Sequence, residues 1–408
     1  RDVLGSRGLG DVYKRQYICR VVRGGYMEYK ILTCGVLLII SLLSIRLSKK
    51  VQVPLLIMFL FIGMLAGSEG IGGIYFDDAA ITQNIGNFAL IFILFSGALE
   101  TKKEDVKAAL YPSGILATAG VFLTAVFAGL FTYFLTNFTL VEAFLFGAIV
   151  SSTDAAAVIS MLGDSNLKKR IKSVIEIESG SNDPMAYALI LFIMSMVKAD
   201  GMTIIGGIIF LIRQLVVGAA FGFLFGKLTL PIGKLLKIER EEFLTIHMIA
   251  MLFICFSVTN ILKGNGFLAI YLMGILVGNQ RFGFRLNTLR NLRVISWLMQ
   301  ISMFIILGLL VFPSQLIKFM LVGSVLAILI TIVSRMAVVY ILLSKFRYTN
   351  KEKFFMGWAG LKGAVPIIFS TMAITEGIEN SQTMFNLVFY ICLLYTSPSP
   401  RDPKTSRM

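Results

Sequence analysis

Histidine is almost missing from this chain of 408 residues, because His247 is the only one. A single histidine excludes a metal site built from several histidine ligands and a serine–histidine–aspartate triad. The four cysteines are scattered, with neither the close spacing of a metal site nor a disulfide framework: they are Cys19, Cys34, Cys255 and Cys392. We therefore expect no enzymatic activity and no cofactor.

Charged residues are also scarce, at 15% of the chain against 57% hydrophobic residues. The mean hydropathy is +0.82. A soluble protein of this length could not bury so much apolar surface, so the composition indicates an all-α integral membrane protein. The formal net charge is +15. Cytoplasmic loops of membrane proteins collect lysine and arginine, which explains this excess without a nucleic-acid partner.

The two ends differ from the rest of the chain. "RDVLGSRGLGDVYKRQ" and "YTSPSPRDPKTSRM" are polar and rich in Gly, Pro, Ser and Arg. They resemble translated adapter sequence, so we expect residues 1–26 to be a non-native extension and residues 394–408 a non-native tail. The membrane domain is then 27–393, beginning at Met27, with its last helix cut short.

Thirteen apolar stretches are candidates to cross a bilayer. They lie at 29–47, 53–67, 85–99, 111–135, 141–162, 172–197, 203–226, 243–262, 266–279, 295–311, 315–343, 354–376 and 383–393. The loops after odd-numbered stretches hold 22 lysines or arginines, whereas those after even-numbered stretches hold only Lys198 and Lys263. This asymmetry predicts that the amino terminus lies outside and the carboxy end in the cytoplasm. The location that we expect is the inner membrane of a prokaryotic cell.

Five ionisable residues lie deep within these stretches when depth is counted at about 1.5 Å per residue. Asp154, Asp183 and Lys362 are close to the centres of the fifth, sixth and twelfth stretches. Glu178 and Arg335 come out at matched depth, within roughly 10 Å of the midplane. An unpaired charge there costs about 3 kcal/mol or more. Glu178 and Arg335 therefore form either a bridge between helices or part of an ion route.

Asp183 has an unusually polar neighbourhood. Glu178, Ser179 and Asn182 precede it within six positions, and Pro184 follows. A proline within a helix removes one backbone donor and so frees one carbonyl. This group of oxygens predicts a site for a monovalent cation, at which Asp183 exchanges a proton for the cation in a cavity reached from alternate sides.

The fifth and twelfth stretches are interrupted near mid-membrane, in "GAIVSSTDAAAV" and "GWAGLKGAVPII". Such breaks are tolerated only where they line a cavity or meet protein. The two stretches are seven apart, and an odd displacement reverses orientation. We therefore predict inverted repeats whose two broken helices cross at the midplane. Asp154 and Lys362 would lie where opposing helix ends meet and would offset the half-helix dipoles.

With "SSTDAAAV", "ESGSNDP", "FLAIYLMGILVGN", "FIILGLLV" and "GLKGAVPII" in this order, the chain closely resembles the monovalent cation/proton antiporters of the NhaP and sodium/proton-exchanger branch. Within that branch, potassium/proton antiporters of NhaP type are the nearest likeness. The resemblance runs from about Met27 to Leu393. It implies a secondary transporter that exchanges K⁺ or Na⁺ for protons, and the expected assembly is a homodimer in the lipid bilayer.

The resemblance also implies roles for single residues. The ion-binding aspartate falls on Asp183, with further oxygens from Ser179 and the Thr153 region. Glu178 would act nearby, bridged to Arg335.

Two positions distinguish this chain from some relatives. Asn182 stands where electrogenic relatives carry a second aspartate, which favours electroneutral exchange. Lys362 stands where relatives usually have arginine, so the charge is kept and the planar fork is lost. Sodium-selective exchange and a cation channel stay open as alternatives, although no pore loop is visible in the sequence.

Overall fold

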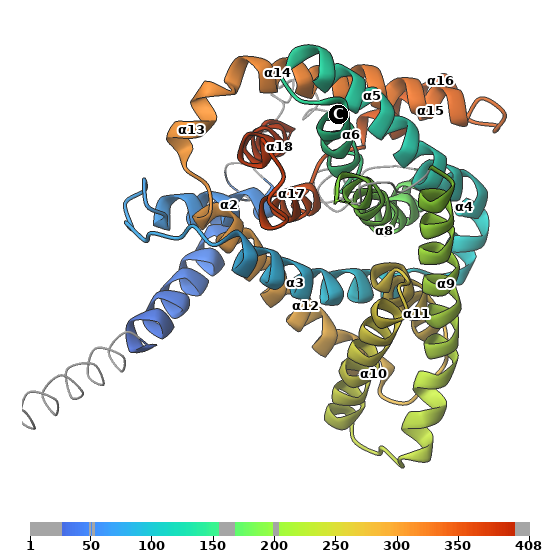
Figure 1. Cartoon of the computed structure of the whole chain (residues 1–408). Coiled ribbons are helices and arrows are strands. Elements are labelled where there is room, and N and C mark those ends of the chain that lie inside the picture. Colours follow the sequence, from blue (N-terminus) through green and yellow to red (C-terminus); the bar gives the residue numbers. More distant parts are fainter. Residues whose placement is uncertain (1–26, 49, 51–53, 155–167, 199–203, 396–408) are drawn as a thin grey trace, which may run out of the picture.

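The computed structural model describes residues 27–48, 50, 54–154, 168–198 and 204–395. The expected extension, and all but the first two residues of the expected tail, lie outside these residues. The described part of the chain is helical almost throughout, and its only β contact is an isolated bridge between Gly67 and Ile74 (Figure 1).

The helices follow the predicted apolar stretches closely. They are Met27–Ser48, α2 (Leu55–Ala66), α3 (Ala79–Glu100), α4 (Lys103–Ile115), η1 (Leu116–Gly120), α5 (Val121–Leu135), α6 (Leu140–Ile149), α8 (Lys169–Lys198), α9 (Ile204–Leu235), α10 (Glu241–Ile261), α11 (Gly266–Gly278), α12 (Arg285–Leu309), α13 (Pro313–Lys318), α14 (Met320–Ile328), η2 (Leu329–Arg335), α15 (Met336–Leu342), α16 (Asn350–Trp358), α17 (Val365–Thr375) and α18 (Ser381–Tyr395). The segments η1 and η2 are π-helical turns that join α4 to α5 and α14 to α15.

Among the described residues, seven helices are long and apolar enough to cross a bilayer, and five shorter apolar helices cover other predicted stretches. The remaining stretch corresponds to α8, which contains the charged residues discussed above. The prediction of an all-helical membrane protein is therefore confirmed, whereas the exact number of thirteen spans stays a prediction.

Polar caps define several helix ends. Asp78 precedes α3, and its carboxylate accepts a hydrogen bond from the backbone N–H of Ile81 at 2.8 Å. Capping boxes start α6, with Thr139 and Glu142, and α16, with Thr349 and Glu352. In each case the side chain satisfies backbone donors that the first turn of a helix leaves free.

The helices form two packed groups. In one, α2, α3 and α12 pack together and α11 joins α3 to α9 and α10; this group is called the wall below. The other group consists of α4 to α6, α8 and α14 to α18, and it is called the bundle below. Figure 1 shows α3 and α12 running along one side of α8, α17 and α18, with α5 and α14 to α16 on the other side.

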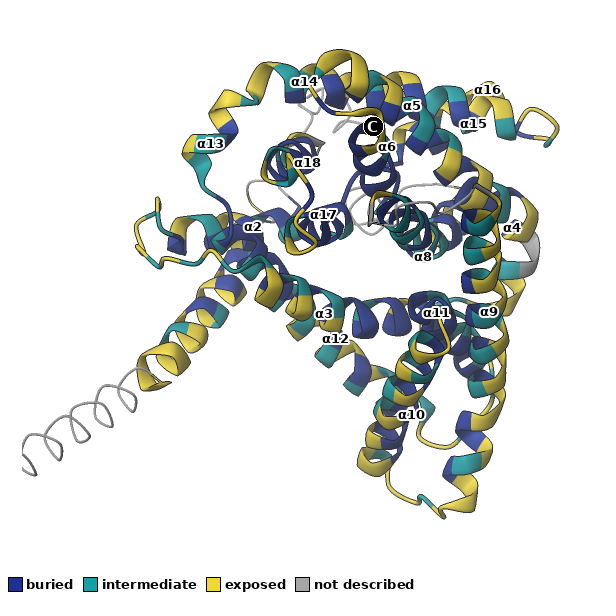
Figure 2. Ribbon diagram, in the orientation of Figure 1, coloured by how far each residue is buried: buried dark blue, intermediate teal, exposed yellow. Residues whose placement is uncertain are grey.

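Figure 2 shows how burial varies over the helices. The central part of the bundle is buried, whereas α9 exposes large apolar side chains along its outer face, including Ile205 at 71% and Val216 at 60%. An outward apolar face is what a helix in contact with lipid requires. Close packing within the wall relies on Gly63 and Gly308, because a Cβ on Gly63 would lie 2.3 Å from the backbone oxygen of Ile305.

The structure shows the interruption of the twelfth stretch in full and the helix end that begins the one in the fifth stretch. The helix α6 ends at Ile149, and residues 151–154 continue without helical structure. The rest of the fifth stretch, residues 155–162, lies outside the described residues. In the twelfth stretch, α16 ends at Trp358 and α17 begins at Val365, with residues 359–364 between them.

Candidate functional site

The two non-helical stretches touch each other. The backbone N–H of Asp154 donates a hydrogen bond to the carbonyl of Leu361 at 2.7 Å. Gly363 is equally close, since a Cβ at this position would lie 2.6 Å from both Cβ and Oδ2 of Asp154. Glycine is therefore required there for the two backbones to approach, and this meeting point of the two non-helical stretches is called the crossing below.

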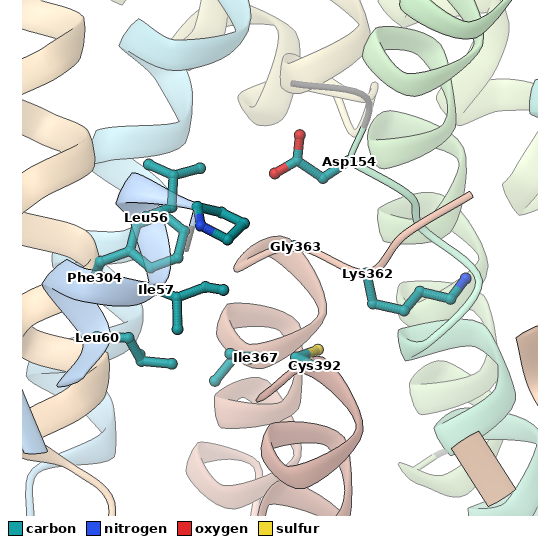
Figure 3. A pocket seen from close by; sticks show the side chains of 10 residues that line it. Leu56, Ile57, Leu60, Asp154, Phe304, Lys362, Gly363, Ile367 and Cys392 are labelled. Carbon is teal, nitrogen blue, oxygen red and sulfur yellow. The ribbon is translucent and has the colours of Figure 1, made fainter. Parts of the chain in front are cut away.

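Lys362 lies on the other side of the crossing. Its side chain is buried, and Nζ donates a hydrogen bond to the carbonyl of Ser152 at 3.2 Å. Figure 3 shows the ammonium group directed away from the carboxylate of Asp154. Both residues line a small cavity of about 20 Å³. Lys362 thus places positive charge just past the end of α6, and Asp154 places negative charge just before α17. This polarity compensates the dipoles of both half-helices.

Asp183 faces the crossing from the middle of α8. Its side chain is buried, and Oδ1 accepts a hydrogen bond from the hydroxyl of Ser152 at 2.5 Å. Pro184, inside the same helix, has no N–H to offer to the carbonyl of Gly180 one turn earlier. The carboxylate of Asp183 and the carbonyl of Gly180 are therefore two oxygens in one turn of α8.

Two more side chains connect α8 to the crossing. The hydroxyl of Ser179 donates to the carbonyl of Thr153 at 3.0 Å, and the amide of Asn182 donates to the hydroxyl oxygen of Thr153 at 2.5 Å. Ser179, Asn182 and Asp183 share one face of the helix, because they are three and four residues apart. The structure thus brings Thr153, Ser179, Asn182 and Asp183 together, with Thr153 as the partner of Ser179 and Asn182, and Ser152 as the partner of Asp183.

A cavity of about 580 Å³ lies against this group. Its polar lining comprises Glu100, Thr101, Asp154, Glu176, Ser179, Asp183, Tyr271 and Gln300. Glu100 is at the carboxy end of α3, where its side chain is 48% exposed. The cavity therefore extends from Asp183 toward the end of the molecule that carries the basic loop after α3.

Glu178 and Arg335 form a buried ion pair. Arg335 Nη2 lies 2.5 Å from Glu178 Oε1, and the two side chains are 4% and 2% exposed. Arg335 is the last residue of the π-helical segment η2 and packs on Gly360, where a Cβ would lie 2.5 Å from Arg335 Nε. The sequence places Glu178 and Arg335 at matched depth, and the structure shows that the two side chains are in contact. This ion pair joins α8 to η2 beside residues 359–364.

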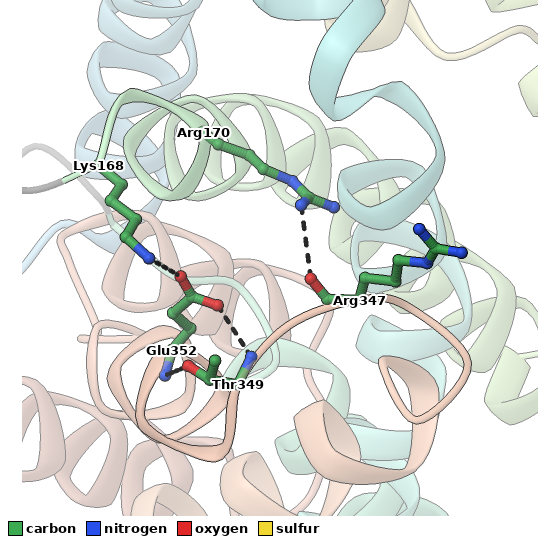
Figure 4. Close-up of polar contacts among 5 residues, drawn as sticks. All are labelled: Lys168, Arg170, Arg347, Thr349 and Glu352. Carbon is green, nitrogen blue, oxygen red and sulfur yellow. Dashed lines mark hydrogen bonds and ion pairs between the residues drawn. The ribbon is translucent and has the colours of Figure 1, made fainter.

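A second link lies at the surface, between the start of α8 and the start of α16 (Figure 4). Lys168 Nζ is 2.8 Å from Glu352 Oε1, and Glu352 also accepts from the backbone N–H of Thr349 at 2.8 Å. The hydrogen bond from Lys168, followed by that from Thr349, lowers the pKa of Glu352 to about 2. Arg170 adds a cation–π contact, 4.2 Å from the ring centroid of Tyr348.

Some residues of the site are not identified by sequence reasoning. Ser152 precedes Thr153 in "SSTD", but nothing in the pattern shows that its hydroxyl reaches Asp183. Tyr271 lies within "FLAIYLMGILVGN", where it is indistinguishable from a residue of an apolar core. Glu352 carries a visible signal, the Thr-x-x-Glu pattern of a capping box, but its partner Lys168 is 184 positions away.

A buried carboxylate beside two non-helical stretches that meet, with a cavity leading to it, is the kind of site expected in inverted-repeat secondary transporters. The family comparison agrees with this class. Residues 36–397 match the model of the family described as "Sodium/hydrogen exchanger, transmembrane", and the chain belongs to this family.

Individual relatives support the same conclusion. The K(+)/H(+) antiporter NhaP of Alkalimonas amylolytica is 37% identical over 366 residues, which cover 89% of this chain and 64% of the relative. The K(+)/H(+) antiporter NhaP2 of Shewanella sp. (strain ANA-3) is 36% identical over 359 residues, which cover 87% and 62%. The chain thus spans less than two thirds of the length of these relatives.

A solved structure shares the fold. The sodium proton antiporter MjNhaP1 from Methanocaldococcus jannaschii superposes with a TM-score of 0.77 at 21% identity, covering 89% of this chain and 94% of that one. The all-helical architecture of this chain is therefore that of a known antiporter, and the chain is an integral membrane protein.

Proposed function

We propose that this protein exchanges a monovalent cation for protons across the membrane by alternating access around Asp183. The observation that carries the proposal is the position of this carboxylate, which is buried in the middle of α8 and yet lines a cavity leading toward the surface. A carboxylate in such a place is stable when it holds a proton or a cation, and unstable when it holds neither.

The surrounding groups can complete a cation site. The carbonyl of Gly180 and the hydroxyl of Ser179 belong to the same turns of α8 as Asp183, and all three residues line the cavity. Carboxylate, carbonyl, hydroxyl and water oxygens are the ligands that hard cations prefer. Thr153 and Asn182 act on this site indirectly, because their mutual hydrogen bond keeps the face of α8 against the crossing.

The same residues favour one proton for one cation. Asn182 does not titrate, because an amide carries no dissociable proton in this range. The carboxylate of Glu178 is already matched by the guanidinium of Arg335 in a buried ion pair. Asp183 is then the group of this cluster that changes protonation, and an exchange of one proton for one monovalent cation moves no net charge.

K⁺ is the favoured cation and Na⁺ is the alternative. The relatives at 36–37% identity are named K(+)/H(+) antiporters, whereas the structural neighbour at 21% identity is a sodium proton antiporter. A cation channel is a less favoured alternative. It would pass current without a proton gradient, whereas an antiporter requires the counter-ion.

The proposal includes a placement in the membrane. The basic loops put the amino terminus outside and the carboxy end in the cytoplasm of a prokaryotic cell. The loop after α3 is one of them, so the cavity that reaches Glu100 opens to the cytoplasm. The proposed assembly is a homodimer in the inner membrane.

The experiment that tests the proposal is cation-induced dequenching of a pH-sensitive dye in proteoliposomes, with K⁺, Na⁺ and Li⁺ compared. Asp183→Asn and Asp183→Ala should abolish exchange and leave a folded, membrane-inserted protein, because a permanently neutral residue neither releases a proton nor holds a cation. Asp77→Asn, in an exposed loop, is the matched control and should exchange normally. Normal turnover in Asp183→Asn would contradict the assignment of Asp183 as the residue that binds the cation and the proton.

A further inference from the structure

One face of α8 continues past Asp183 and packs against α11 of the wall. Gly180, which lines the cavity, receives the ring of Tyr271, because a Cβ on this glycine would lie 2.5 to 2.8 Å from three ring and hydroxyl atoms. One turn further along, the side-chain amide of Asn265 donates a hydrogen bond to the carbonyl of Pro184 at 2.6 Å. These contacts connect the two helix groups immediately beside the carboxylate of Asp183.

Aromatic rings extend the same contact. Tyr187 lies one turn after Asp183, and its ring centroid is 4.9 Å from that of Phe267 in α11. Phe256 of α10 packs on Phe267 at 5.2 Å, and Phe369 of α17 packs on Tyr187 at 5.7 Å. The contacts at residues 180, 184 and 187 share one helix face, and together they are called the seam below.

The seam lies along the cavity. Tyr271 and Gly180 are part of the lining. Phe267, one turn before Tyr271 in α11, is buried and is not part of the lining. The lining thus includes the exposed Glu100 on the side of the basic loops, whereas Pro184 and Tyr187, which follow Asp183 in α8, are not part of it.

Asn265 is held firmly for its part in the seam. Its backbone N–H donates to the carbonyl of Gln214 in α9 at 3.0 Å, and its side-chain oxygen caps α11 by accepting from Leu268 at 3.0 Å. The residue is fully buried. The cap holds the side-chain oxygen in place, and the amide nitrogen of the same group then points to the carbonyl of Pro184 in α8. Asn265 is therefore a preorganised donor from the wall to the ion-binding helix.

We infer that the seam is the closed gate toward the face opposite the basic loops, and that Asn265 is its latch. The hydrogen bond to Pro184 stabilises the state in which the cavity is open on the basic side. The inference rests on the proposed alternating access, because a latch has meaning only if α8 and α11 separate in a second state. In that state the hydrogen bond is broken and Asp183 is reached from the opposite face.

The test removes the latch and keeps the cap. In Asn265→Ser the hydroxyl still caps α11, since serine is a preferred residue at this position. The shorter side chain has no amide to reach Pro184. Asn260→Ser is the matched control, because Asn260 caps the same turn by accepting from the backbone N–H of Gly266 at 3.1 Å and its contact stays within the wall.

The readout is the sidedness of thiol labelling in oriented vesicles. One reporter is Ile93→Cys, which lines the cavity. The other is Leu191→Cys, which continues the helix face of the seam beyond Tyr187. The native cysteines are replaced by serine, and a membrane-impermeant maleimide is applied from each side. In Asn265→Ser, labelling of Ile93→Cys should fall and labelling of Leu191→Cys from the opposite side should rise.

The ratio of the two labelling rates should shift about fivefold, the effect of losing one neutral hydrogen bond from one of two states. Asn260→Ser should leave the ratio unchanged. An unchanged ratio in Asn265→Ser would overturn the latch, and so would a parallel rise at both reporters, which would mean general loosening. If Asn265→Ser does not fold, Phe267→Leu, which removes the ring contact with Tyr187, should shift the ratio in the same direction, and its failure to do so would also overturn the gate.

Labelling does not depend on transport, so the two proposals fail separately. A wild-type protein that exchanges ions while the ratio is insensitive to Asn265→Ser would contradict the latch alone. A ratio that shifts in a protein without proton exchange would support the gate and contradict the antiport proposal.

Discussion

Replacing Glu178 by glutamine leaves the guanidinium of Arg335 buried without its counter-charge. The two groups are 2.5 Å apart and at most 4% exposed, so water cannot replace the lost carboxylate. Removing one partner of such a pair costs about 3–5 kcal/mol. Arg335→Met, which strands the carboxylate instead, should cost a similar amount, and both single variants should express poorly.

The double variant Glu178→Gln/Arg335→Met should be more stable than the sum of the single losses predicts. Both charges are then absent, and the coupling energy between the two sites should approach about 3 kcal/mol, the upper end for residues in contact. The charge swap, with arginine at 178 and glutamate at 335, should recover part of the loss. The assay is thermal unfolding of the purified protein in detergent for the complete mutant cycle.

The pair Arg293–Glu100 is the matched control. It has the same chemistry at 2.8 Å, but its side chains are 57% and 48% exposed. A double-mutant cycle on this pair should give a coupling of about 1 kcal/mol or less. Strict additivity at Glu178 and Arg335, or a coupling no larger than that of the exposed pair, would contradict the buried ion pair.

Two further predictions concern pH and voltage. Lys168 and Thr349 lower the pKa of Glu352 from 4.5 to about 2, so the stability from this contact is complete above pH 4.5 and is lost as the pH falls toward 2. Glu352→Gln should therefore flatten the acid limb of the unfolding profile in that window, and superimposable wild-type and variant profiles would disprove the link. Exchange should not respond to a membrane potential clamped with an ionophore that does not carry the transported cation, because the proposed cycle moves no net charge. An exchange rate that rises with the imposed voltage would mean that a second group changes protonation during the cycle, and Glu178 would be the first candidate.

The sequence predicts the interruptions of the helices because their causes are local. Small residues and Ser-Ser-Thr-Asp end α6, and the glycines around Lys362 together with Pro366 separate α16 from α17. The depth of Glu178 and Arg335 is equally predictable, since the rise of a helix per residue is fixed. Pairing then requires only that the two helices be neighbours.

The contacts at the site itself are less predictable. The hydrogen bond from Ser152 to Asp183 joins residues 31 positions apart and depends on how the crossing lies against α8. Arg335 is the last residue of a π-helical turn, which alters the direction of its guanidinium group. No residue in "LITIVSR" predicts such a turn. Such turns arise from tertiary packing, and they recur at functional sites.

Helix ends show the same limit. The seventh stretch is predicted to end at residue 226, where the apolar run stops, but α9 continues to Leu235 and contains Pro231. Hydropathy reports the part of a helix that lies in the bilayer, whereas the helix itself continues beyond the apolar core for as long as its backbone is hydrogen-bonded.

Competition between protons and the cation tests the central claim most directly. The measurement is the apparent cation affinity in proteoliposomes, determined by dye dequenching at a series of pH values with K⁺ as the substrate. If Asp183 holds either a proton or the cation, the apparent KM should rise about tenfold for each unit of pH below the pKa of the site, with the maximal rate unchanged. An apparent KM that does not change with pH would contradict a shared site at Asp183.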